Sequence, residues 1–122
     1  MKTERFRKFF VWNKSTTFVT DIYKVTEKFP NREIYGLTDQ IRRAAISICL
    51  NIAEGSGAGS DLEFSRFVTI AKRSVFEVIA GLEIAINLGY IDRRSAEILM
   101  DNADELAAML TGLVKKLRAN SK

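Results

Sequence analysis

The chain has 122 residues, of which 47% are hydrophobic and 28% are charged, and its formal net charge is +4. This length suits one domain with a single core, and the composition is too apolar for a disordered tail. No apolar run reaches the ~18–20 residues that cross a bilayer, and the first residues lack the apolar stretch of a signal peptide. We therefore expect a single domain over residues 1–122 that is cytoplasmic and does not associate with a membrane.

The side-chain inventory removes most familiar catalytic arrangements. The chain contains no histidine and a single cysteine, Cys49. Histidine is the commonest general base and metal ligand, and one cysteine can form neither an internal disulfide nor a thiolate metal cage. Carboxylate and lysine chemistry remain open on composition alone.

The segment before Pro30 is expected to form the first helix. Pro30 is the only proline in the chain, and it predicts a break because proline cannot continue a helix and restricts the residue before it. A polar run at residues 15–17 interrupts the apolar face of this segment. The residues assigned to that face are Phe9, Trp12, Val19, Ile22 and Phe29.

The second segment is apolar on almost every side between Ala44 and Ala53. A helix of this kind is buried on more than one side, so we expect it to meet another subunit or an unusually covered site. Cys49 lies within this run and is interpreted as a small buried hydrophobic residue. The glycine-rich run from Gly55 to Ser60 follows a helix and lacks the lysine of a phosphate-binding loop, and we interpret it as a turn.

The third and fourth helices have clear start and stop signals. Ser60 lies three residues before Glu63, as in a capping box, Gly89 predicts the end of the third helix, and Asp92 can cap the fourth. The fourth helix carries a heptad seam made of Leu99, Ala103, Leu106, Leu110, Leu113 and Leu117. Such a seam favours packing at about 20°. Four helices with short connections predict an all-α, antiparallel, up-down-up-down four-helix bundle.

One polar line, spaced three or four residues apart, runs along the otherwise apolar second helix. The turn at residues 55–60 sets an approximate register with the third helix. Because buried polar groups need partners, we expect an interhelical network that fixes this register. The predicted network comprises Gln40, Ser47, Asn51, Glu54, Ser74 and Glu77.

Three carboxylates near this line have a functional alternative. Glu54, Glu63 and Glu77 could act as paired acids and bases or hold a metal. Known metal sites in bundles combine glutamates with Glu-x-x-His motifs, and this chain has no histidine. The sequence therefore predicts no metal site.

Basic side chains concentrate in the first part of the chain, with ten against five acidic ones in residues 1–50, and nine against ten thereafter. Such a surplus favours an anionic partner. Neighbours on a helix point about 100° apart, so one member of an adjacent pair can pack while the other faces water. If Arg43 joins the polar network, Arg42 is free, with Lys72 or Arg73 about one turn away across the interface. These four residues are candidates for phosphate contacts, and an ordinary solvated surface is the alternative.

Several of these features also form a family pattern. The chain resembles a four-helix-bundle family whose founding members are encoded in intervening sequences of bacterial 23S ribosomal RNA genes. The match extends over nearly the whole chain. The motifs that carry it are Phe29-Pro30, Tyr35-Gly36-Leu37, Gln40-Ile41-Arg42-Arg43-Ala44, Asn51-Ile52-Ala53-Glu54-Gly55, Glu63-Phe64 and Leu88-Gly89-Tyr90-Ile91.

The resemblance implies a bundle that assembles as a ring-like homopentamer, with no enzymatic activity and no cofactor. The accessory variability protein of diversity-generating retroelements is similar to this family and is a basic pentamer that binds nucleic acid and a reverse transcriptase. By that analogy Arg42, Arg43, Lys72 and Arg73 are candidates for an RNA-facing surface. The leading hypothesis is a non-enzymatic oligomeric bundle that binds RNA. The alternative is a protein-interaction scaffold whose functional unit is the homo-oligomeric ring, without nucleic-acid binding.

Overall fold

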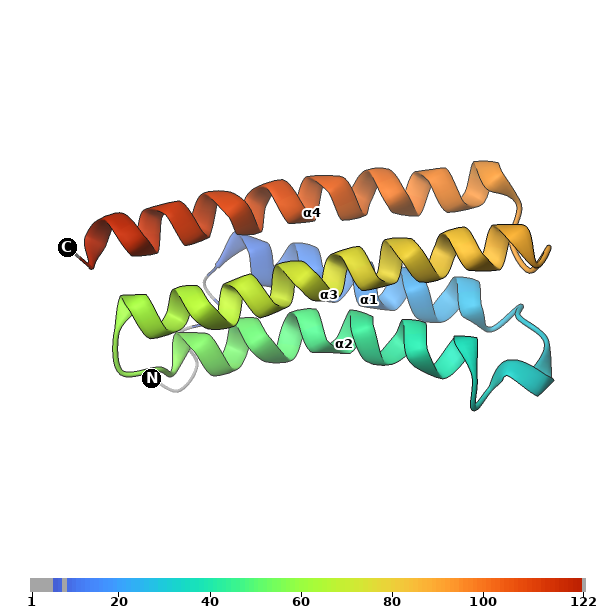
Figure 1. The fold of residues 1–122 in the computed structure, drawn as a ribbon, viewed down its shortest axis with the longest axis horizontal. Helices are drawn as coiled ribbons and strands as arrows, with labels where there is room; N and C mark the ends of the chain where they lie inside the picture. Colours follow the sequence, from blue (N-terminus) through green and yellow to red (C-terminus); the bar gives the residue numbers. More distant parts are fainter. Residues whose placement is uncertain (1–5, 8, 122) are drawn as a thin grey trace.

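A computed structural model describes residues 6, 7 and 9–121 of the chain. The elements are α1 (Phe10–Thr26), a short 3₁₀ helix η2 (Asn31–Glu33), α2 (Leu37–Ser56), α3 (Asp61–Asn87) and α4 (Arg93–Asn120). No strand occurs among the described residues. The long helices alternate in direction, and each of α1 and α3 packs against both α2 and α4 (Figure 1). The predicted all-α four-helix bundle is therefore confirmed.

The heptad seam of α4 faces the core as predicted. Its leucines and its alanine are buried, except for Leu113, which is half-buried and packs against the core. α3 contributes the largest fully buried side chain, Phe64, and a continuous apolar face beyond it. Among the described residues no helix is long and apolar enough to cross a membrane.

The apolar face of α1 differs from the predicted one. The buried positions of the helix are Val11, Ser15, Phe18, Ile22 and Thr26. Of the predicted residues, Ile22 and Phe29 are buried, whereas Phe9, Trp12 and Val19 are partly buried and pack against the core from its edge. Ser15 does not interrupt the face but lies inside it, because its hydroxyl donates to the Trp12 carbonyl at 2.9 Å and accepts from the Cys49 thiol at 3.4 Å. A serine whose hydroxyl is satisfied in this way can occupy a core position.

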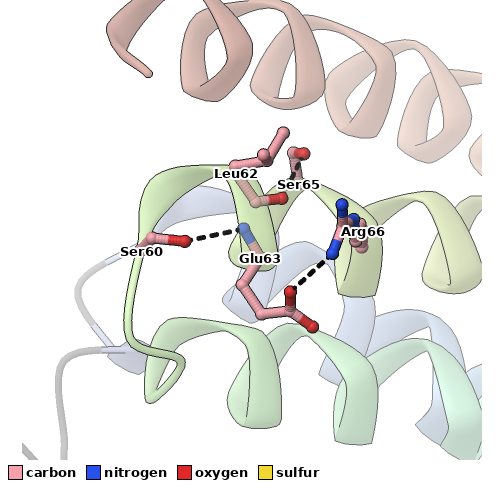
Figure 2. A network of polar contacts seen from close by, with 5 residues as sticks. All are labelled: Ser60, Leu62, Glu63, Ser65 and Arg66. Atoms are coloured by element: carbon pink, nitrogen blue, oxygen red, sulfur yellow. Dashed lines mark hydrogen bonds and ion pairs between the residues drawn. The ribbon is translucent and has the colours of Figure 1, made fainter. Parts of the chain in front are cut away.

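The helix ends follow the local signals of the sequence. Ser60 accepts a hydrogen bond from the Glu63 amide at 3.1 Å, as Figure 2 shows. The capping box is only half formed, because the Glu63 carboxylate pairs with Arg66 at 2.9 Å. Asp92 accepts from the Ser95 amide at 3.0 Å and caps α4. Gly89 has φ of 76°, a left-handed conformation that suits glycine, and ends α3.

Within the single chain, α2 is not covered on every side. Ile48 and Ile52 are fully buried, whereas Leu50 is 52% exposed. Cys49 is buried as predicted, and burial raises the pKa of its thiol. The outward side of the apolar run thus remains open to solvent or to a partner.

Candidate nucleic-acid interface

Arg42 lies on the side of α2 that faces α1. Its Nε donates to Thr26 Oγ1 at 2.8 Å, and a terminal nitrogen lies 3.4 Å from the Tyr23 carbonyl oxygen. The guanidinium carbon is 4.4 Å from the centroid of the Tyr23 ring, within the range of a cation–π interaction. Arg42 shares this side of the helix with the buried Ala45 and Cys49, three and seven residues further on, and it is half-buried.

Arg43 points away from the bundle. Its side chain is 79% exposed and forms an ion pair of 2.9 Å with Asp39, one turn earlier on α2. The expectation that Arg43 joins the polar network and leaves Arg42 free is therefore wrong, and the two roles are reversed. The reason is the rotation of α2, which turns residue 42 toward α1 and residue 43 to solvent.

The two basic residues of α3 differ in the same way. Lys72 is half-buried, one turn from the buried Val68 and Val75, whereas Arg73 is exposed. Within the described residues the side chains of Lys72 and Arg73 form neither a hydrogen bond nor an ion pair. Arg43 and Arg73 are thus the two members of the predicted set that present their charge to solvent.

A smaller polar network than predicted joins α2 and α3. Ser74 Oγ donates to Ser47 Oγ at 2.9 Å, and it also lies 3.2 Å from the Ile70 carbonyl oxygen. Asn51 Nδ2 donates to Ser47 twice, to the carbonyl oxygen at 2.8 Å and to Oγ at 3.0 Å. The structure therefore brings together three of the six predicted members.

The other three members lie at the solvent edge of the two helices. Gln40, Glu54 and Glu77 are exposed, and within the described residues none of their side chains has a hydrogen bond or an ion pair. Their inclusion in an interhelical network was wrong, because water can satisfy polar groups at this edge. Gln40 and Glu77 do line one small cavity of about 130 Å³ between α2 and α3.

The acidic side chains considered for a metal do not gather at one place. The Glu63 carboxylate is paired with Arg66, at the start of α3. In the part of the chain that the structure describes, no group of three or more Cys, Asp or Glu side chains is placed to hold a metal ion.

With this geometry in place, the comparisons with known proteins identify the family. The sequence model of the 23S rRNA-intervening sequence protein family matches residues 7–112. The chain belongs to this family. A solved structure of a Bacteroides thetaiotaomicron protein of unknown function from the S23 ribosomal protein family is similar, with a TM-score of 0.77 and 29% sequence identity. The alignment covers 86% of this chain and 98% of that one. Among proteins with curated descriptions, none matches.

This family member also has a feature that the sequence analysis missed, at the end of the bundle where α1, η2 and α2 meet. A cavity of about 270 Å³ lies there, and Arg42 forms part of its wall. Next to it, the Tyr90 hydroxyl donates to Glu33 Oε2 at 2.7 Å, and Glu33 Oε1 accepts from the Leu37 amide at 3.1 Å. Since the contributing residues come from separate elements, no local pattern in the sequence indicates this arrangement.

Proposed function

We propose that the chain is a non-enzymatic, oligomeric bundle that binds structured RNA through phosphate contacts of exposed arginines. The observation that carries the proposal is the exposure of Arg43 and Arg73 on the adjacent helices α2 and α3. The chain's net charge of +4 and the 23S rRNA association in the name of its family support the same class of partner. No cofactor is needed for such binding.

The relative positions of the two arginines follow from the Ser47–Ser74 hydrogen bond. Arg73 is the neighbour of Ser74, and Arg43 lies one turn before Ser47. Packed helices are ~8–10 Å apart, so the two arginines lie on neighbouring helices and can contact different phosphates of one RNA. Such contacts are independent of sequence and weaken as salt rises.

The test is a salt titration of binding to a structured RNA and to duplex DNA. The Arg43→Glu/Arg73→Glu variant should lower RNA affinity at least tenfold and flatten the dependence of log K on log salt by roughly 0.7–0.9 for each lost contact. The matched control is Lys115→Glu/Lys116→Glu, which makes the same change in net charge at exposed positions of α4. Equal losses in both variants, or no binding of the wild type at low salt, would overturn the proposal.

A second candidate function rests on exposed apolar side chains of α2 and α3. Leu50 and Ile70 are 52% and 42% exposed. Leu50 lies three residues after Ser47 and Ile70 four before Ser74, so both are displaced from the Ser47–Ser74 bond toward the same end of the bundle. This apolar surface supports a homo-oligomeric scaffold, a pentamer by resemblance, whose assembled ring binds another protein.

Light scattering tests the second candidate. The wild type should have a mass that is a multiple of 13.8 kDa, and Leu50→Glu/Ile70→Glu should reduce it to that of a single chain. Ile98→Glu is the control, because Ile98 is 61% exposed on α4, away from this surface. A wild type that is monomeric at high concentration would exclude the scaffold.

A further inference from the structure

The cavity at the end of the bundle has the composition of a small-ligand site. It lies where the end of α1, the η2 turn and the start of α2 meet, at the right-hand end of Figure 1. Its volume of about 270 Å³ is just below the ~300–1,000 Å³ of sites that enclose drug-sized ligands. It therefore has room for a ring-sized group rather than for a whole cofactor.

The apolar part of the wall suits a flat ring. Tyr23, Phe29, Pro30 and Ile34 line the cavity; Phe29 is 5% exposed, and the Arg42 guanidinium lies over the Tyr23 ring. The Phe29 ring is fixed by its contact with the Tyr90 ring, whose centroid is 5.6 Å away. Aromatic side chains of this kind are the surfaces on which proteins stack unpaired bases.

The polar part of the wall can read the edge of such a ring. Thr38 is only 4% exposed and lines the cavity, and its hydroxyl forms no hydrogen bond with another described residue. Because no fully buried side-chain oxygen among these residues lacks a partner, this hydroxyl is accessible from the cavity. The Asn31 amide offers both donors and an acceptor. Arg42 uses Nε and one terminal nitrogen for α1, and its remaining N–H groups are available at the wall. Glu27 also lines the cavity, which disfavours a simple anion such as free phosphate.

We propose that this cavity binds an unpaired base of an RNA loop or bulge, with Arg42 next to the base or its phosphate. The exposed Tyr35 side chain, next to the cavity residue Ile34, favours an RNA base over other ring-shaped ligands. Tyr35 adjoins Ile34 in the sequence and is 94% exposed, so its ring is free to stack a second base. The exposed Lys28 and Arg32 add positive charge near the same end. The biological ligand in this inference rests on the proposed RNA binding, but the site itself is testable without RNA.

The first experiment uses free nucleotides. AMP, GMP, CMP and UMP are each titrated into the ¹⁵N-labelled wild-type protein, with inorganic phosphate as the comparison. At least one nucleotide should give saturable shifts at low millimolar concentration in the amides of Asn31, Ile34 and Thr38. Phosphate should give no saturable shifts at these amides. Failure of all four nucleotides, or phosphate binding of equal strength, would overturn the inference.

Matched substitutions locate the site. Thr38→Val removes the unpartnered hydroxyl without changing the shape of the side chain, and it should weaken nucleotide binding on the order of fivefold. The control is Thr20→Val, because Thr20 is exposed and its hydroxyl donates only to the Thr16 carbonyl. Equal nucleotide affinity in wild type and Thr38→Val would count against the site, and the unchanged fold of each variant is checked by its amide spectrum.

RNA then connects the site with the proposed function. Tyr35→Ala should weaken binding of a hairpin RNA with an unpaired loop at least threefold, leave a blunt duplex RNA unaffected and leave nucleotide binding unaffected, since Tyr35 does not line the cavity. If nucleotides fail to bind but RNA affinity still depends on Arg43 and Arg73, the cavity inference is wrong and the proposed function stands. If nucleotides bind but RNA does not, the proposed function is wrong and the cavity is a nucleotide site.

Discussion

The Tyr90 hydroxyl donates a 2.7 Å hydrogen bond to Glu33 Oε2 and thereby joins the η2 turn to the connection between α3 and α4. The other carboxylate oxygen of Glu33 accepts from the Leu37 amide, in the first turn of α2. The hydrogen bond from Tyr90 is the main cause that lowers the pKa of Glu33 below its ordinary value of 4.5, and the bond from the Leu37 amide lowers it further. One carboxylate thus connects three segments beside the cavity.

The Tyr90–Glu33 hydrogen bond makes the stability of the fold depend on pH at both the acidic and the alkaline end of the range. A group whose pKa is lowered by folding stabilises the fold above its ordinary pKa and loses that contribution as the pH falls through the folded value. The pKa of Tyr90 is raised above 10.0, chiefly by its bond to Glu33, so its contribution is present below that value and lost as the pH rises through the folded value. The Tyr90–Glu33 bond should therefore stabilise the fold between about pH 4.5 and 10.0.

Tyr90→Phe should lower Tm near neutral pH, and the difference from wild type should shrink as the pH falls below 4.5. Thermal unfolding followed by circular dichroism across the pH range measures this difference. Asp92, whose pKa is also lowered, is present in both proteins and cancels in the comparison. Tyr35→Phe is the control, since Tyr35 is 94% exposed. A difference that is independent of pH would mean that the Tyr90 hydroxyl acts without regard to the charge on Glu33.

Gly36→Ala should displace the Glu33 carboxylate. A Cβ at residue 36 would lie 2.6 Å from Glu33 Oε1, so the carboxylate must move away from the Leu37 amide. We expect a lower free energy of unfolding in urea and a Glu33 pKa that returns toward 4.5, measured from its ¹³C carboxyl shift. Gly112→Ala is the matched control. A Cβ at residue 112, an exposed position of α4, would meet no atom within 4 Å. Gly112→Ala should therefore stabilise the fold by ~0.5–1 kcal/mol.

The Ser47–Ser74 hydrogen bond should behave as a coupled pair. Ser74 is buried, so Ser74→Ala removes the donor to Ser47 and should cost about 1 kcal/mol of unfolding free energy. Ser47→Ala/Ser74→Ala should cost less than the sum of the two single changes, because each single change already removes the Ser47–Ser74 bond and the second change cannot remove it again. A thermodynamic cycle in urea measures the coupling. If the free-energy costs of the two single changes simply add, the Ser47–Ser74 bond contributes no coupling energy between α2 and α3.

The sequence sufficed for the features that depend on near neighbours in the chain. Pro30 breaks a helix because its ring restricts the backbone, and Gly89 ends one because glycine readily adopts a positive φ. Ser60 and Asp92 cap helices through amides three residues away. The heptad seam of α4 likewise needs only the period of its leucines. These features could be predicted without knowing what packs against them.

Features that depend on how one helix is rotated against another could not be predicted. α2 is apolar almost all round, so its own pattern does not say which side faces α1, and the roles of Arg42 and Arg43 were reversed. The Tyr90–Glu33 bond joins residues that are 57 positions apart. The cavity beside it is formed by three elements that meet only in the folded chain.

The close contact between α2 and α3 at Gly81 gives the last prediction. A Cβ at residue 81 would lie 2.6 Å from Cγ1 of Ile41, which is 1% exposed and cannot move into solvent. Gly81→Ala should therefore destabilise the fold by ~1–3 kcal/mol, although alanine is the better helix former.

Ile41→Ala alone leaves a cavity and should cost ~2–5 kcal/mol. In Gly81→Ala/Ile41→Ala the new methyl group enters the space that Ile41 vacates, so the two costs should partly cancel. A coupling energy of ~1 kcal/mol or more in a urea cycle is expected. Because Gly112→Ala reports the helix-propensity gain without a neighbour, its value separates propensity from packing. If the costs of Gly81→Ala and Ile41→Ala simply add, α2 and α3 must move apart to accept the methyl group. The Gly81–Ile41 contact would then not fix the distance between the two helices that carry Arg43 and Arg73.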